Sequence, residues 1–219
     1  MIHDKYTYPG TEGVLVNHLG IRDADLLDTA INELASIRWA GLLRQTPPQE
    51  FTFETLRAIH ERLFREILPF AGELRDVDTQ AVGSGIVYCR PDYIPAALDA
   101  AFAKLRRHSY LAGLDAPTFA DGLADHWGEL SAIHPFRDGN TRSQCAYVSA
   151  LAESAGHPIR WSAVDVDRLR ALRLAAVAGH DKPLASYVES VLGLSTNPPE
   201  RLVFTRRITR KPEGGWGIG

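Results

Sequence analysis

The sequence contains only two cysteines, Cys89 and Cys145, among 219 residues. Neither belongs to a CxxC pair, and two cysteines are too few for a disulfide-stapled scaffold. No apolar run approaches the ~20 residues that a membrane helix requires. The opening residues, MIHDKYTYPG, carry neither the basic nor the apolar segment of a secretion signal. These absences predict a cytoplasmic protein that makes no membrane contact.

The chain also lacks an excess of basic charge. Its formal net charge is −3, from 24 Lys and Arg against 27 Asp and Glu. Direct nucleic-acid binding is therefore not expected, because such domains carry a basic footprint. The exception is the last nineteen residues, which hold five basic side chains and a single acid, Glu213. We expect one domain over residues 1–195, followed by a basic tail or short extension over residues 196–219.

The sequence does contain a helical periodicity of apolar residues along most of its length. Asp23 or Asp25 precedes a first apolar face, and Thr52 has the position of an N-cap for a second. Further helices are expected after residue 92, up to residue 134, and over residues 141–155, about 164–177 and about 183–192. The pattern predicts an all-α fold built as a helical bundle.

One stretch interrupts the helical pattern. Residues 75–91 read RDVDTQAVGSGIVYCRP, in which Gly83-Ser84-Gly85 separates two short β-prone pieces. This composition predicts a small β-hairpin, over about residues 76–90, inserted among the helices. An isolated two-stranded hairpin is only marginally stable, so it must pack on the helices or be completed by another strand.

The loop HPFRDGNTR, residues 134–142, begins where an amphipathic helix is expected to end. His134 there is a base that titrates near neutral pH. Phe136 is the only large apolar residue of the loop and is expected to anchor it in the core. Gly139 and Asn140 suit a tight turn, and Asn140 is expected to cap the following helix.

The second half of the same loop favours an anion. A helix that starts near residue 140 presents free backbone N–H groups beside Arg142, which is an arrangement that binds phosphate. Asp138 offers a carboxylate oxygen suited to Mg²⁺ that shares the phosphates and keeps most of its water. A base, a metal carboxylate and an anion site within nine residues predict transfer of a phosphorus-centred group to a hydroxyl.

The loop resembles the motif of the Fic family, HPFx(D/E)GNGRxxR. The similarity extends over residues 6 to about 193 and includes YTYP from Tyr6, NHLGI from Asn17, IHERLF from Ile59 and PFAGELR from Pro69. The resemblance implies the Fic fold, a helical bundle with a small β-hairpin flap beside the active-site loop. Pro135 and Gly139 fit the Fic pattern better than that of the related Doc branch.

The resemblance also implies an activity and a role for each residue. Fic proteins mostly transfer AMP from ATP to a Ser, Thr or Tyr hydroxyl of another protein. His134 would deprotonate that hydroxyl, Asp138 would hold Mg²⁺, and Phe136 would be the buried anchor. The nucleotide phosphates would be bound by Gly139, Asn140, Thr141 and Arg142. The flap edge that pairs with the target backbone would be Gly85, Ile86, Val87 and Tyr88.

Two positions depart from the family motif. Thr141 stands in place of the second glycine, which is a mild change if only its N–H is needed and a strained one if a glycine conformation is required. Cys145 stands in place of the second arginine. These departures keep two alternatives open. One is a Doc-like kinase or a transferase of another nucleotide, and the other is a nucleotide- or antitoxin-binding module with little turnover.

Regulation is expected from a partner. The sequence matches the family's inhibitory motif, (S/T)xxxE(G/N), only at Thr209 to Gly214, where Pro212 disfavours a helix. The N-terminal layout is similar to that of Fic toxins held inactive by a small antitoxin, so we expect a separate protein to supply the inhibitory helix. Bacterial relatives make type II topoisomerase subunits one candidate target.

Overall fold

The computed structural model of the chain describes residues 5–81 and 85–193, which contain seven α-helices and three short 3₁₀ helices. The α-helices are α1 (Ala24–Leu42), α2 (Phe53–Phe64), α3 (Ile94–Arg107), α4 (Ala116–Ile133), α5 (Asn140–Ser154), α6 (Val166–Val177) and α7 (Lys182–Val191). The 3₁₀ helices are η1 (Pro91–Tyr93), η2 (Ser109–Leu111) and η3 (Trp161–Ala163). The predicted all-α bundle is confirmed. The expected tail at 196–219 and the match at Thr209 to Gly214 lie outside the described residues.

Polar side chains fix where several helices begin. Asp23, rather than Asp25, caps α1, and its carboxylate accepts a hydrogen bond from the backbone N–H of Leu26 at 2.8 Å. Thr52 caps α2 in a reciprocal arrangement with Thr55. Such caps satisfy N–H groups that the helix itself leaves without partners.

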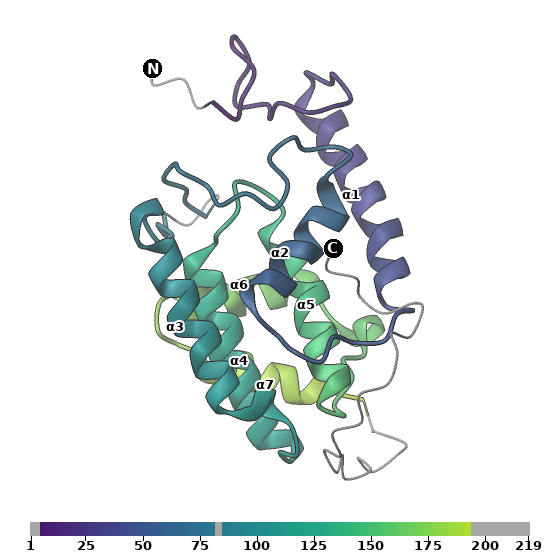
Figure 1. Cartoon of the computed structure of the whole chain (residues 1–219), viewed down its shortest axis with the longest axis vertical. Coiled ribbons are helices and arrows are strands. Elements are labelled where there is room, and N and C mark those ends of the chain that lie inside the picture. The colour runs from purple at the N-terminus through teal and green to yellow at the C-terminus, as the bar shows by residue number, and fades with distance from the viewer. Residues whose placement is uncertain (1–4, 82–84, 194–219) are drawn as a thin grey trace, which may run out of the picture.

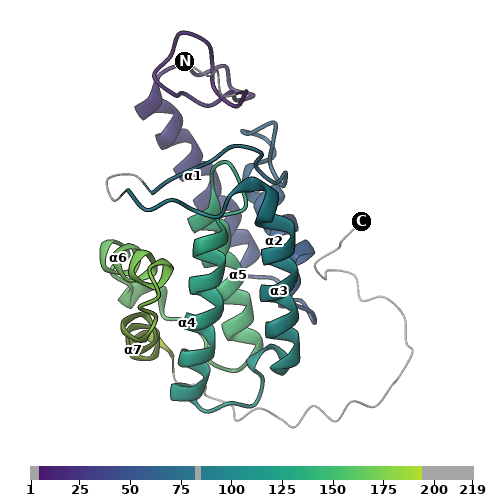
Figure 2. The ribbon, with the colours of Figure 1, turned by 90° about the vertical axis from the view of Figure 1, so that its left-hand side faces the viewer.

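The bundle is built around α4 and α5. Figure 2 shows α3, α4 and α5 running alongside one another, with α6 and α7 on the other side of α4. Every residue from 143 to 152 of α5 is buried, as expected for a helix enclosed on all sides. Figures 1 and 2 both place the loop after α4 and the residues 76–81 and 85–90 at the same end of the bundle.

The predicted hairpin is present as a minimal antiparallel pairing. Gln80 pairs with Val87, the Ala81 N–H donates to the Ile86 carbonyl at 2.8 Å, and the Tyr88 N–H donates to the Thr79 carbonyl at 3.1 Å. Within the described residues of this segment the pairing is a single bridge, not two full strands. We call residues 76–81 and 85–90 the flap.

None of the helices in residues 5–81 and 85–193 is long and apolar enough to cross a bilayer.

Two core histidines should make the stability depend on pH. Burial lowers the pKa of His60 to about 4 and that of His126 to about 3. Below about pH 6.5 the unfolded chain therefore binds protons that the folded chain does not, and folding becomes less favourable as the pH falls.

We expect the free energy of unfolding to fall between pH 6.5 and pH 5 by about 2 kcal/mol for each of these histidines. Denaturant unfolding across this range measures the slope. The variant His126→Leu should reduce the slope by about 1.4 kcal/mol per pH unit. An unchanged slope in this variant would contradict the buried neutral state of His126.

Candidate active site

Arg75 joins the flap to the C-terminal end of α4. Its side chain is almost fully buried, with 2% exposed. The guanidinium donates to the carbonyls of His134 at 2.7 Å, Val77 at 2.7 Å and Ile133 at 3.1 Å, and also to the carbonyl of Cys89. Two of these carbonyls belong to the flap and two to the end of α4, so one side chain holds both segments.

His134 occupies a left-handed backbone position, with φ 49°, directly after α4. Its ring stacks face to face on the ring of Tyr88 from the flap, with centroids 3.7 Å apart, and its Nδ1 atom is buried without a hydrogen-bond partner. Burial lowers the pKa of His134 to about 3, and the positive charges of Arg173 and Arg75 act in the same direction. The imidazole is therefore neutral at physiological pH and able to accept a proton.

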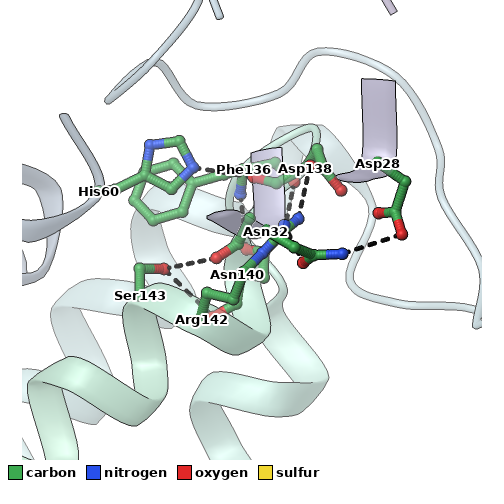
Figure 3. A network of polar contacts seen from close by, with 9 residues as sticks. Asp28, Asn32, His60, Phe136, Asp138, Asn140, Arg142 and Ser143 are labelled. Atoms are coloured by element: carbon green, nitrogen blue, oxygen red, sulfur yellow. Dashed lines mark hydrogen bonds and ion pairs between the residues drawn. The ribbon is translucent and has the colours of Figure 1, made fainter. Parts of the chain in front are cut away.

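The loop after His134 is anchored by Phe136, which is 1% exposed. The Asn140 side chain accepts from the Phe136 N–H at 2.9 Å and donates to the Phe136 carbonyl at 2.7 Å (Figure 3). The prediction that Asn140 caps α5 is wrong. Gly139, with φ 80°, is the N-cap, and Asn140 is already the first helical residue, so its side chain crosses the loop instead.

His60 of α2 supports the same loop by packing against Phe136. The Gly72 N–H donates to its Nδ1 at 2.9 Å, so the ring proton lies on Nε2, which donates to the Asp138 carbonyl at 2.8 Å. The ring also stacks on Phe136, with centroids 3.8 Å apart. The sequence pattern places His60 on an apolar stripe but gives no sign of this contact with the loop.

Asp138 and Arg142, predicted for Mg²⁺ and for phosphate, form an ion pair with 3.0 Å between the carboxylate and the guanidinium. Arg142 also donates to the Asn32 side chain of α1 at 2.8 Å (Figure 3). In the part of the chain that the structure describes, no group of three or more His, Cys, Asp or Glu side chains could hold a metal ion. A Mg²⁺ ion here would thus have Asp138 as its protein carboxylate, which fits an ion bound mainly through nucleotide phosphates and water.

The two departures from the motif lie on one face of α5, four residues apart. Thr141 lies in the first turn and is not among the non-glycine residues with positive φ, so it imposes no glycine-only conformation. Its hydroxyl accepts a hydrogen bond from Arg173 at 3.1 Å. Cys145 is buried, and burial raises the pKa of its thiol to about 11. The thiol is therefore protonated and unreactive.

A cavity of about 50 Å³ lies beside the loop, between the flap and helices α4, α5 and α6. It is lined by Ala81, Tyr88, Ser131, His134, Thr141, Arg170, Arg173, Leu174 and Val177. Arg173 was not identified from the sequence. The available signal was its position four residues after Leu169, on the buried face of α6.

The edge of the flap that is predicted to pair with a target is exposed at Val87. Val87 is 61% exposed. Because Gln80 and Val87 form the non-hydrogen-bonded type of pair, the peptide groups of Val87 point away from the Gln80 strand. The Ile86 carbonyl and the Tyr88 N–H face the other way and pair with Ala81 and Thr79. Gly85, at the start of this segment, has φ 69°.

The chain is similar to known proteins of one family. The Fic/DOC family profile matches residues 50–152. The protein adenylyltransferase VbhT of Bartonella schoenbuchensis is 31% identical over 188 residues, which cover 85% of this chain and 38% of VbhT. The probable protein adenylyltransferase Fic of Escherichia coli is 32% identical over 162 residues, covering 74% of this chain and 78% of that protein. The probable protein adenylyltransferase y4lH of Sinorhizobium fredii is 30% identical over 194 residues, covering 87% and 97%.

Solved structures agree on the fold. BepC of Bartonella tribocorum, solved with bound AMPPNP, superposes with a TM-score of 0.80 at 26% identity, covering 86% of this chain and 96% of BepC. The N-terminal Fic domain of a Bep effector from Bartonella sp. AR 15-3 gives a TM-score of 0.81 at 28% identity, covering 92% and 94%.

The loop geometry requires glycine at residue 139. Gly139 has φ 80°, and a Cβ there would meet a ring carbon of Phe64 at 2.5 Å. We expect Gly139→Ala to destabilise the protein by about 2–4 kcal/mol through backbone strain and the clash. The control is Gly156→Ala, where φ is 85° but no atom lies within 4 Å. It should cost only the strain, about 1 kcal/mol. Equal losses in denaturant unfolding would contradict the close contact with Phe64.

Proposed function

This chain belongs to the Fic/DOC family, and from that premise we propose that it is a protein adenylyltransferase, moving AMP from ATP to a Ser, Thr or Tyr hydroxyl of a target protein. The observation that carries the proposal is the placement of His134, which directly follows α4, stacks on Tyr88 of the flap and begins the loop that leads into α5. It is supported by relatives that bear this name, two of which the chain spans to 78% and 97% of their length.

In the proposed reaction the target oxygen attacks the α-phosphorus of ATP, and its proton passes to His134. The bond from the α-phosphorus to the oxygen that bridges it to the β-phosphate breaks, and pyrophosphate leaves. A low pKa of the free imidazole keeps it unprotonated, and the arriving negative phosphates raise its affinity for the proton. The N–H groups around Gly139, Asn140 and Thr141, with Arg142, would hold the phosphates.

We propose Mg²⁺ as the metal that accompanies ATP. Asp138 would hold it, because its carboxylate lies on the loop that precedes α5 and is partly exposed. The ion would supply positive charge to neutralise the phosphate oxygens. In this state Arg142 would exchange its contact with Asp138 for the phosphates.

The flap would bind the target by strand addition. The peptide groups of Val87 that face away from Gln80 can pair with an extended target segment. Pairing at this edge would bring a hydroxyl on the target close to His134, because Tyr88, the next residue, stacks on the His134 ring.

A second candidate activity follows from Cys145. Because this position supplies no cation, transfer of the γ-phosphate as in a Doc-like kinase, or transfer of UMP or GMP, is a rival reaction. Binding of nucleotide or antitoxin with little turnover is the non-enzymatic rival. The labelling experiment below separates all of them.

We further propose that the protein is the toxin of a toxin–antitoxin pair in the cytoplasm, with type II topoisomerase subunits as a candidate target. A separate small antitoxin would supply the inhibitory helix. Leu26 and Ile37, which are 56% and 69% exposed on one face of α1, offer apolar contacts for such a helix. Co-purification with the product of a neighbouring small gene would support this pairing, and its absence would count against it.

The reaction is tested by label transfer. Purified protein is mixed with Mg²⁺ and either cell lysate or purified topoisomerase subunits. Separate samples receive ATP labelled on the α-phosphate, ATP labelled on the γ-phosphate, or UTP or GTP labelled on the α-phosphate. We expect label from the α position only. His134→Ala should reduce it by at least about 100-fold, the usual contribution of a general base.

The matched control is His108→Ala, which changes an exposed histidine at the end of α3 and should leave labelling intact. Label from the γ position alone would replace the proposal with the kinase reaction. No label from ATP, UTP or GTP with a folded protein would leave only a binding module.

A further inference from the structure

Arg173 of α6 is a buried cation, with 5% of the residue exposed. Its guanidinium donates to the hydroxyls of Ser131 and Thr141, each at 3.1 Å, and to the side-chain oxygen of Gln144 at 2.5 Å. It also lies over the ring of Trp127, 5.4 Å from the centroid. All of these partners are neutral, and within residues 5–81 and 85–193 no carboxylate forms an ion pair with it.

Arg75 shows how the same fold compensates another buried arginine. Its four acceptors are backbone carbonyls, and two of them stand at the C-terminal end of α4, where the helix dipole is negative. Arg173 instead donates to side chains, those of Thr141 and Gln144 in the first turns of α5 and that of Ser131 in the last turn of α4, so it faces one positive and one negative helix end. None of these side chains is negatively charged, and a buried cation without an anionic partner is unfavourable.

The surroundings of Arg173 leave room for that anion. A guanidinium has five N–H donors, and three hydrogen bonds are formed. The cavity that Arg173 lines measures about 50 Å³, several times the roughly 10–15 Å³ needed for one water. The buried Nδ1 atom of His134, which lines the same cavity, also has no hydrogen-bond partner.

The distribution of charge selects which part of a nucleotide binds beside Arg173. The α-phosphate is esterified to the ribose and carries less negative charge than the terminal phosphates, which undergo a second ionisation near neutral pH. A buried cation without an anionic partner therefore attracts the end of the polyphosphate chain most strongly.

The face of α5 that Arg173 contacts has no positive charge of its own. Thr141 and Cys145 are four residues apart and share one helix face, and neither side chain carries a positive charge. Arg173 donates to Thr141, and its charge acts on the thiol of Cys145. A cation from α6 thus covers the face of α5 that has none of its own.

We propose that Arg173 binds the terminal phosphates of the nucleotide, so that α6 supplies the cation for the leaving pyrophosphate. The inference rests on the proposed adenylyl transfer for the identity of the nucleotide. As the bond between the α-phosphorus and the bridging oxygen breaks, its electron pair goes to that oxygen, and Arg173 stabilises the negative charge of the pyrophosphate. No proton leaves Arg173 in this step.

The test measures pyrophosphate binding by calorimetry, with and without Mg²⁺, to the wild type and to Arg173→Met. Methionine fills a similar volume without the charge. We expect Arg173→Met to lose at least about tenfold in affinity for pyrophosphate, because charge-assisted hydrogen bonds are lost. Its affinity for AMP should change little. The control Arg168→Met alters an exposed arginine of the same helix and should bind pyrophosphate like the wild type.

A folded Arg173→Met with wild-type affinity for pyrophosphate would overturn the proposal, as would the absence of pyrophosphate binding to the wild type at millimolar concentration. An equal loss of AMP affinity would also overturn it, since the α-phosphate would then be the group bound. If Arg173→Met does not fold, Arg173→Lys keeps the charge but not the planar fork. The proposal then requires at least a several-fold loss of pyrophosphate affinity.

The outcomes separate this inference from the activity. If pyrophosphate binding depends on Arg173 but the protein labels no target, the proposed anion site is supported and the proposed adenylyl transfer is wrong. If Arg173→Met transfers AMP at an unchanged rate, the proposed anion site is wrong and the proposed activity is correct.

Discussion

The contact on which the site depends is the insertion of the Arg75 guanidinium among four backbone carbonyls of the flap and of α4. The flap itself has one antiparallel bridge in its described residues, too little to be stable alone. Arg75 and the hydrogen bond from the Cys89 N–H to the Ala132 carbonyl, at 2.9 Å, attach it to the bundle. This attachment sets the position of Tyr88.

The position of Tyr88 helps to set the protonation state of His134. Tyr88 covers one face of the imidazole, and two buried arginines add positive potential. These effects hold the ring neutral, which a general base requires before substrate binds. On the other side of the loop, His60 and Phe136 fix the backbone at Asp138. The loop is therefore held from both sides before any nucleotide arrives, so little reorganisation is needed during the reaction.

Local chemistry explains what could be predicted from the sequence. Helix starts follow from the caps Asp23 and Thr52, and the breaks follow from glycine and proline. The roles of Arg75 and Arg173 could not be predicted, because their partners are distant in sequence. Arg75 lies 59 positions from His134, and Arg173 lies 42 positions from Ser131. Asn140 shows the limit of local rules. Its residue type suits an N-cap, yet the positive φ of Gly139 moves the cap back by one position.

The most direct test is the pKa of His134, measured by NMR titration of the imidazole in the wild type and in Arg75→Lys. Lysine keeps the charge but cannot reach four carbonyls, so it releases the flap. We predict a pKa near 3 in the wild type and a shift towards about 6.5, the value of an exposed histidine, in the variant. A wild-type pKa at or above about 6.5 would contradict a neutral base held under the flap.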